Sequence, residues 1–202
     1  MIYLSKEIES WERFYRAHFI NTLSGFKSVS LIGTTDASGN PNLAIFSNIV
    51  HLGADPALVG FVNRPLEAGG HTLTNIKETK YYTINHIHTG IMEQAHQTSA
   101  KYAKGVSEFE QVGLRADWNE DFKAPFVAES NIKYGLSLEQ VIPIEMNGTF
   151  FVIGKIEMVM VDKELIQQDG FIDLQKAGSL CSSGIDSYHL VEEGKRFAYA
   201  KV

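Results

Sequence analysis

The chain has 202 residues with a formal net charge of −6 and a pI near 5.6, and it is 44% hydrophobic and 21% charged. Such a composition is that of a globular protein with its own core, and it excludes a disordered or fibrous chain. An acidic chain gives no electrostatic reason to bind a polyanion, so we expect no nucleic-acid partner. One domain over residues 1–202 is the simplest expectation at this length.

The cellular compartment is suggested by what the sequence lacks. The one cysteine, Cys181, cannot form an internal disulfide, and the N-terminal stretch MIYLSKEIESWERF carries charges where a signal peptide needs an apolar run. No segment approaches the roughly 20 apolar residues of a membrane span. We therefore expect a cytoplasmic protein that does not contact a membrane.

The first elements along the chain are a helix and a hairpin. An amphipathic helix is predicted within residues 1–24, because Ile8, Trp11, Tyr15 and Phe19 recur at helical spacing and Ser5 is placed to cap the start. Residues 27–35 then alternate small polar and aliphatic side chains. The pattern resumes at residue 41 after the turn signal DASGN, which predicts a β-hairpin.

The middle of the chain alternates strands with short helices. Residues 57–64 and 81–88 are rich in β-branched and aromatic side chains and are predicted as strands. Residues 71–80 and 91–103 are predicted as helices. These helical pieces are too short for a doubly wound parallel sheet.

Two long extended patterns dominate the second half. Residues 126–144 and 149–165 read as long strands, with a bulge or barrel corner expected at Gly154. Together with the earlier strands they favour a mainly β architecture, closed or nearly closed into a barrel. Residues 175–202 are expected to form a C-terminal extension of the barrel core at 27–174, and its Tyr188, Phe197 and Tyr199 are expected to dock on the domain or on a second subunit.

Most familiar catalytic signatures are missing. His86 and His88 are two apart and would share one face of a strand, but without further ligands nearby the pair does not predict a metal site. No nucleophile motif surrounds Cys181, and neither a dinucleotide fingerprint nor a P-loop is present. The acidic segments SEFEQ and WNEDF are interpreted as solvated turns.

An anion site can be assembled from several places. The strand-like stretch NLAIFSNI, residues 42–49, is interrupted by Asn42, Ser47 and Asn48, and Arg64 ends the next strand. Thr72 begins a helix, where backbone N–H groups and an arginine fork would suit phosphate. The flexible backbone at positions 69–70 and the polar side chains at 99 and 101 could complete the pocket. Spacing alone favours the simpler alternative, in which Arg64 is a surface residue and Thr72 only caps the helix.

The order of these pieces resembles a known family. The run from SVSLIGTT through NLAIFSNI and FVNRP, followed by HTLTNI, YYTINHI, SAKYAKGVSEFEQVGL, APFVAES and FFVIGKIEMVMVD, is similar to the flavin-reductase-like family of FMN-binding split β-barrel proteins. The similarity covers roughly residues 27–174. It implies a six-stranded antiparallel Greek-key split barrel with an N-terminal helix and peripheral helices, usually homodimeric, with FMN in a groove near the subunit interface.

The resemblance also implies which residues contact the cofactor. The flavin is expected along the opening strand and the phosphate at the next strand end and helix start, with a third contact from SAKY. On this sequence the implied contacts are Ala44, Phe46, Ser47, Asn48, Asn63, Arg64, His71, Thr72, Asn75, Ser99, Lys101 and Tyr102. His71 stands where many members have Asp or Ser. Asn42 is expected to serve the turn instead.

The implied function is an FMN-binding oxidoreductase. Reduced nicotinamide would transfer hydride to the flavin, and the electrons would pass to free flavin or another acceptor. Because the flavin carries the chemistry, no catalytic residue is assigned. Two alternatives remain open: a non-enzymatic FMN-binding electron carrier, and a split-barrel scaffold without cofactor. No recognisable nicotinamide-nucleotide motif chooses between NADH and NADPH.

Overall fold

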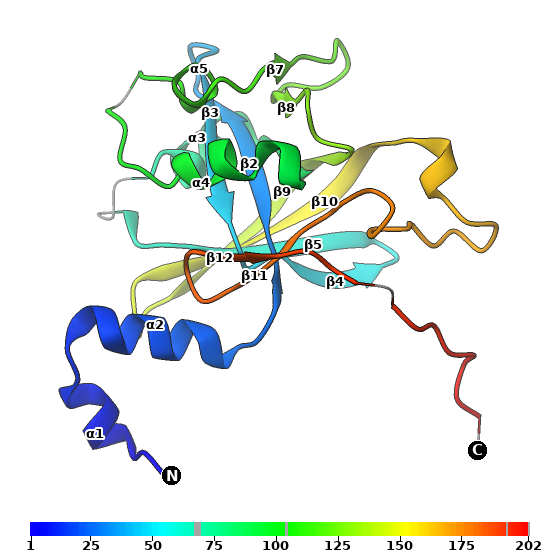
Figure 1. Ribbon diagram of the computed structural model, residues 1–202. Helices are drawn as coiled ribbons and strands as arrows, with labels where there is room; N and C mark the ends of the chain where they lie inside the picture. The colour runs from blue at the N-terminus through cyan, green and yellow to red at the C-terminus, as the bar shows by residue number, and fades with distance from the viewer. Residues whose placement is uncertain (67–69, 104, 193, 202) are drawn as a thin grey trace.

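A seven-stranded antiparallel sheet forms the centre of the molecule (Figure 1). The computed structural model describes residues 1–66, 70–103, 105–192 and 194–201. The strand order in the sheet is β3-β2-β6-β9-β10-β5-β4, one strand more than the six expected. The strands are β2 (Ser30–Thr35), β3 (Pro41–Phe46), β4 (Val50–Ala54), β5 (Ala57–Asn63), β6 (Tyr81–His86), β9 (Ile132–Ile144) and β10 (Thr149–Val161).

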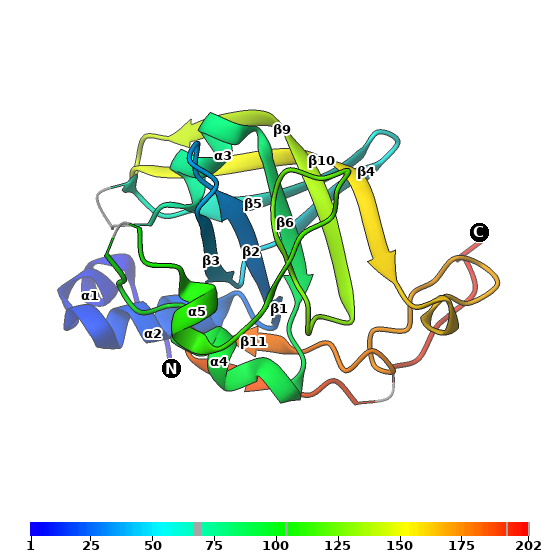
Figure 2. The same ribbon diagram turned by 90° about the horizontal axis from the view of Figure 1, so that it is seen from above.

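The sheet curls around a shared core, as Figure 2 shows from above. Ile32 of β2 and Phe61 of β5 are separated by three strands in the sheet, yet both are fully buried in one hydrophobic cluster. Phe46 at the end of β3 packs edge-on against Phe61, with ring centroids 5.0 Å apart. The predicted mainly β, barrel-like fold with peripheral helices is therefore confirmed.

Gly154 lies at an irregularity in β10, as its sequence position predicts. The pairing of β10 with β9 shifts register between Ile153 and Gly154. A side chain at Gly154 would meet the ring of Tyr82 and the backbone oxygen of Ser137. The glycine thus lets β10 bend closely over β6.

The predicted first hairpin is confirmed. β2 pairs with β3 in a register that places Ser30 opposite Phe46 and Thr35 opposite Pro41. In the turn, the Asp36 carboxylate accepts hydrogen bonds of 2.9 Å from the N–H groups of both Ser38 and Asn40. An Asx turn of this kind explains why the polar segment after residue 35 reverses the chain.

Short helices cover the sheet. They are α3 (Thr72–Thr79), η2 (Thr89–Ile91), α4 (Met92–Gln97), α5 (Glu108–Val112) and η3 (Lys163–Leu165). The helix predicted over 71–80 is confirmed. The one predicted over 91–103 is shorter, because the Thr98 hydroxyl bonds the Ala95 carbonyl at 2.8 Å and the chain then leaves the helix. A second core cluster, including Leu43 and Phe109, fixes α4 and α5 against β3.

Two small sheets complete the fold. β1 (Lys27–Ser28), β11 (Cys181–Ser183) and β12 (Ser187–His189) form one, in the order β1-β11-β12. β7 (Ala116–Asp117) pairs with β8 (Phe126–Val127) in the other. The long strand predicted over 126–144 is therefore broken into β8 and β9, because the Ser130 hydroxyl bonds the carbonyls of His86 and Ile132 and turns the chain between them.

The N-terminal segment contains two helices, not the single one predicted. α1 (Ser5–Ser10) ends before Trp11, and α2 (Arg13–Leu23) begins after Glu12. The Glu12 carboxylate caps α2 by accepting from the N–H groups of Phe14 and Tyr15 at 2.8 and 3.1 Å. Ser5 is not the cap, because Leu4 occupies that position. Neither helix buries a residue, and Phe14, Ile20 and Leu23 of α2 are exposed.

The tail docks only in part. Tyr188 lies half-buried in β12, whereas Phe197 and Tyr199 are 80% and 91% exposed. Docking on the domain is thus confirmed for Tyr188 and wrong for the other two, whose contact with a second subunit stays a prediction. Over the part of the chain that the structure describes, no helix has the length and hydropathy needed to cross a membrane.

Candidate functional site

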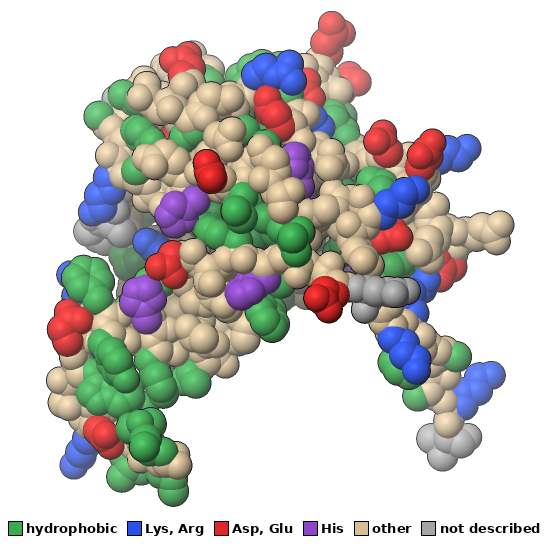
Figure 3. Space-filling model, viewed as in Figure 1, with side chains coloured by type: hydrophobic (Ala, Val, Ile, Leu, Met, Phe, Trp, Pro, Cys, Tyr) green, Lys and Arg blue, Asp and Glu red, His purple; other side chains and the backbone are tan. Residues whose placement is uncertain are grey.

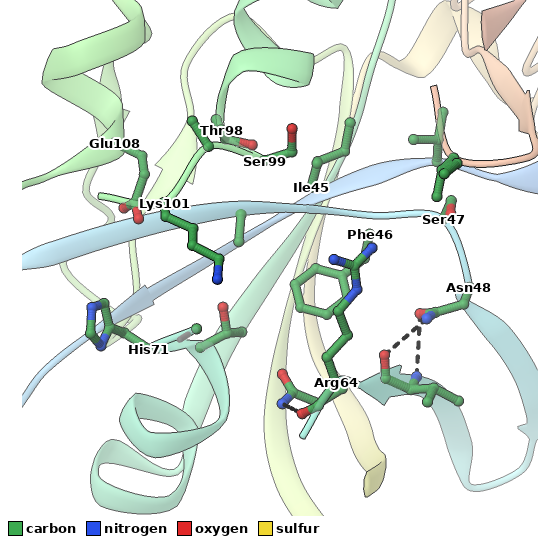
Figure 4. A pocket seen from close by; sticks show the side chains of 18 of the residues that line it. Ile45, Phe46, Ser47, Asn48, Arg64, His71, Thr98, Ser99, Lys101 and Glu108 are labelled. Carbon is green, nitrogen blue, oxygen red and sulfur yellow. Dashed lines mark hydrogen bonds between the residues drawn. The ribbon is translucent and has the colours of Figure 1, made fainter. Parts of the chain in front are cut away.

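A cavity of about 390 Å³ opens where β3, β5, α3 and the C-terminal hairpin formed by β11 and β12 meet (Figure 4). Its size falls within the usual range of small-molecule sites. Eleven of the twelve residues expected at a cofactor site line it: Ala44, Phe46, Ser47, Asn48, Asn63, Arg64, His71, Thr72, Ser99, Lys101 and Tyr102. Gly70 lines it as well, whereas the glycine at position 69 lies outside the described residues.

Asn75 is the twelfth residue, and it does not line this cavity. Its side-chain N–H donates to the Thr34 hydroxyl at 3.1 Å, which ties α3 to β2. It faces a neighbouring cavity of about 380 Å³ beside the first hairpin. The two cavities share Asn42 and His71 in their walls.

The end of β3 provides an apolar wall followed by polar groups. Ala44, Ile45 and Phe46 line the cavity, and Phe46 is held in place by Phe61. Beyond them the Asn48 amide bonds the backbone of Val62 twice, accepting from its N–H at 3.2 Å and donating to its carbonyl at 2.9 Å. The pairing of β3 with β2 ends at Phe46, and beyond it Asn48 joins the cavity wall to β5 through these two hydrogen bonds.

Two cations extend into the cavity from different elements. Arg64 follows β5, and its backbone carbonyl accepts from the Asn63 side chain at 2.7 Å. Lys101 comes from the loop after α4 (Figure 4). Neither side chain forms an ion pair with any residue that the structure describes. Both charges are thus available to an anion.

The start of α3 adds further donors. His71 occupies the N-cap position, but its side chain does not cap the helix. The first N–H groups of an α-helix have no partner within the helix, and they lie at the positive end of its dipole. Since Gly70, His71 and Thr72 all line the cavity, this helix terminus suits a phosphate.

Glu108 is the one acidic side chain in the cavity wall among the described residues. It is 7% exposed, and its carboxylate accepts from the Leu43 N–H at 3.0 Å. Burial raises the pKa of the Glu108 carboxyl, while backbone hydrogen bonds and the nearby His71 oppose the rise. The interpretation of SEFEQ as a solvated turn is wrong at this residue, because α5 packs against β3.

Two buried polar groups in the cavity wall have no partner. Asn42 is 7% exposed and Ser182 is 4% exposed, and neither the Asn42 Nδ2 nor the Ser182 Oγ forms a hydrogen bond. Unpaired buried groups are costly, so each of these two atoms requires a hydrogen-bond partner from within the cavity, either a ligand atom or water. The expectation that Asn42 serves the turn is wrong, because it pairs with Thr34 inside the sheet.

The C-terminal hairpin closes one side of the cavity. Ser182, Ile185 and Tyr188 contribute to its wall, and a 2.7 Å hydrogen bond joins the Tyr188 hydroxyl to the His96 Nδ1. Sequence reasoning did not place these residues at the site. The one sequence signal for this contact was the aromatic side chain of Tyr188, which predicts that the tail docks but does not predict the surface on which it docks.

The histidine pair has other contacts. The His86 Nδ1 lies 3.0 Å from the Ser179 hydroxyl, and burial lowers the pKa of His86 to about 4. The His88 Nε2 bonds the Glu129 carbonyl at 2.9 Å. Among the residues that are described, no three His, Cys, Asp or Glu side chains are grouped so as to hold a metal ion.

Fold and site together define a split-barrel protein whose cavity combines an apolar wall with two cations and a helix start. A family model described as the flavin reductase like domain matches residues 23–174. The chain therefore belongs to this family, as its sequence order predicts.

Solved structures that are similar to the chain include the following three. One is a split barrel domain protein of Shewanella frigidimarina NCIMB 400 designated a flavin reductase, with 50% identity, a TM-score of 0.95 and coverage of 99% of this chain and 100% of that one. Flavoredoxin of Desulfovibrio vulgaris (Miyazaki F) has 22% identity, a TM-score of 0.75 and coverage of 87% and 92%. An FMN-binding protein of Thermus thermophilus has 16% identity, a TM-score of 0.69 and coverage of 86% and 90%. The last two likenesses show the fold alone.

Proposed function

We propose that the chain binds FMN in the 390 Å³ cavity and acts as an NAD(P)H-dependent flavin reductase. The observation that carries the proposal is that one cavity combines an apolar wall with a cationic region, whose Arg64 and Lys101 form no ion pair with a described residue. Ala44, Ile45 and Phe46 provide the first, while Arg64, Lys101 and the start of α3 provide the second. A flavin mononucleotide has a flat, partly apolar ring system at one end and a phosphate at the other.

The polar groups of the wall fit this ligand. Flavin rings and ribityl chains carry hydrogen-bond acceptors and hydroxyls, which can pair with the orphaned Asn42 Nδ2 and Ser182 Oγ. In this assignment Ser47 is the hydroxyl contact, whereas Asn48 holds the wall that positions it. Ser99, Tyr102 and Thr72 contribute further polar contacts around the phosphate-bearing end.

The role of the protein follows from what flavin supplies. Bound flavin accepts hydride from reduced nicotinamide and passes electrons onward, so the chain has to bind, orient and shield it. Phe46, fixed against Phe61, would orient the ring, and Arg64 with Lys101 would anchor the phosphate. We assign no side chain to proton transfer in this reaction.

A homodimer forms part of the proposal. α1 and α2 bury none of their residues, and Phe14, Leu23 and Phe26 are each at least 66% exposed. Figure 3 shows hydrophobic side chains gathered over these helices at the lower left. Asn21 of α2 also lines the cavity, so a second subunit on this face would lie near the flavin.

Two measurements on the purified protein test the function. Titration with FMN should quench flavin fluorescence and shift its visible absorbance. Anaerobic mixing of the complex with NADH or NADPH should then bleach the flavin band. Unchanged FMN spectra would contradict the proposal altogether.

Binding without bleaching by either nicotinamide would instead favour an electron carrier. This alternative is kept because the same cavity would serve a flavin that only carries electrons. The comparison of NADH with NADPH in the same experiment also identifies the preferred donor.

A further inference from the structure

Glu108 places a carboxylate in the wall of a cavity proposed to bind an anionic ligand. Its carboxylate lies in the same cavity wall as His71, Lys101 and Thr72, which are the groups proposed to hold phosphate. Figure 4 shows Glu108 extending toward the side of the cavity where Lys101 and His71 lie. Two like charges close together in a partly buried site repel each other strongly, because little water screens them.

The carboxylate cannot move away from this position easily. Glu108 is 7% exposed, it begins the short helix α5, and the Leu43 N–H holds its Oε2 at 3.0 Å. Phe109 beside it is buried in the core that joins α5 to β3. A bound phosphate would therefore meet a fixed carboxylate and not a mobile surface side chain.

Among the described residues, no other acidic side chain near Glu108 lines the cavity. Its strand neighbour β3 carries no titratable side chain. α3 brings His71, and the loop after α4 brings Lys101 and Tyr102 to the same cavity. α4, which also packs against α5, carries Glu93 and His96, and His96 is bonded to Tyr188. On α5 itself the other acid, Glu110, is exposed.

We propose that Glu108 takes up a proton when the phosphate-bearing end of the flavin binds, and so makes FMN binding proton-linked. The inference rests on the proposed function, since it needs a flavin phosphate in this cavity. The protonated carboxyl would remain hydrogen-bonded to Leu43 and could donate its new proton to the ligand. The proton comes from solvent, and no bond of the flavin changes.

The sign of the pH effect follows from the charges. The pKa of Glu108 is already raised by burial in the free protein, and a neighbouring phosphate raises it further. A group that binds a proton more tightly in the complex makes the complex more stable as pH falls. Affinity for FMN should thus rise as pH falls through the interval between the two pKa values, with no such contribution for riboflavin.

The test compares E108Q with the unchanged protein. Glutamine keeps the acceptor for Leu43 but loses the charge. At pH 8, E108Q is expected to bind FMN about tenfold more tightly, the equivalent of one pKa unit of coupling, and to bind riboflavin unchanged. E110Q is the matched control, because it removes an exposed charge from the same helix. Kd values from flavin fluorescence over pH 5.5–8.5 give the comparison.

Calorimetry of FMN binding in two buffers of different ionisation enthalpy counts the protons taken up. The unchanged protein and E110Q should take up more protons than E108Q. Equal FMN affinity and equal proton uptake in E108Q would overturn the inference and leave the proposed function intact. If E108Q does not fold, absence of proton uptake by the unchanged protein would overturn it as well. Failure of the unchanged protein to bind FMN would overturn both.

Discussion

Arg64 and Lys101 are the residues whose surroundings point most directly to a ligand. Each lines the cavity, and neither has an acidic partner among the described residues. A surface cation is hydrated and contributes little, whereas a guanidinium facing phosphate forms a charge-assisted, bidentate contact. A comparison of a ligand that has a phosphate with one that lacks it can therefore distinguish these two cations from ordinary surface charges.

Replacement of Arg64 by alanine should weaken FMN binding much more than riboflavin binding. The lost phosphate contact corresponds to roughly 1.5–3 kcal/mol, or at least about tenfold in Kd. Riboflavin lacks the phosphate, so its Kd should change little. Fluorescence titration with both ligands measures the difference.

Lys163→Ala provides the control for Arg64→Ala. Lys163 is an exposed cation in η3 and lines neither cavity. Its loss should leave both Kd values unchanged. Equal losses of FMN and riboflavin affinity in Arg64→Ala would show that Arg64 does not contact the phosphate.

At the same scale, sequence reasoning found only part of the cavity wall. Ser47, Arg64 and Lys101 were predictable because each belongs to a short segment in the family's order. Glu108 and Ser182 were not, since their burial depends on α5 packing against β3 and on β11 returning beside β1. Nothing local in either segment specifies these contacts.

At the scale of elements, the sheet depends on close approaches between backbones. Gly33 of β2 faces the chain before β8, where the Thr83 hydroxyl donates to the Pro125 carbonyl at 2.6 Å. A Cβ at Gly33 would collide with both of these oxygens. The carbonyl cannot move aside as a flexible side chain could.

Gly33→Ala is therefore expected to lower the free energy of unfolding by about 1–3 kcal/mol, the usual range for an overpacked core. Urea denaturation followed by tryptophan fluorescence measures it. Gly194→Ala is the control, because no atom lies within 4 Å of a Cβ there. Equal stability of the two variants would contradict the close approach.

Secondary structure was predicted best where a pattern repeats over many residues. β9 and β10 have 13 residues each and lie within the two long strands predicted over 126–144 and 149–165, but β9 begins only at Ile132 and β10 ends at Val161, before the short helix η3. The break between α1 and α2 was not recognised, because the apolar spacing of Ile8, Trp11, Tyr15 and Phe19 continues across it. Capping by Glu12 decides the break, and periodicity does not detect caps.

At the scale of the whole molecule, the split-barrel fold could be predicted from the order of its segments. The assignment of residues 1–202 to a single domain stays a prediction, and so does the second subunit. What the sequence could not show is that the N-terminal helices lie against no core of their own chain. A contiguous apolar surface of this kind usually marks an interface.

The dimer predicts a mass of twice 22.5 kDa in solution. Light scattering coupled to size-exclusion chromatography should give about this value at micromolar concentration. The double substitution Phe14→Glu and Leu23→Glu places two charges on α2 where the apolar surface is 66–67% exposed. Since a buried unpaired charge is strongly unfavourable, this variant should be monomeric and still folded.

Met146→Glu serves as the control, because Met146 is 95% exposed in the turn between β9 and β10 and belongs to neither N-terminal helix. It should remain a dimer. A dimeric α2 variant would show that subunits associate through another surface. A monomeric unchanged protein would remove the proposed second subunit, and Asn21 would then line a cavity completed by one chain alone.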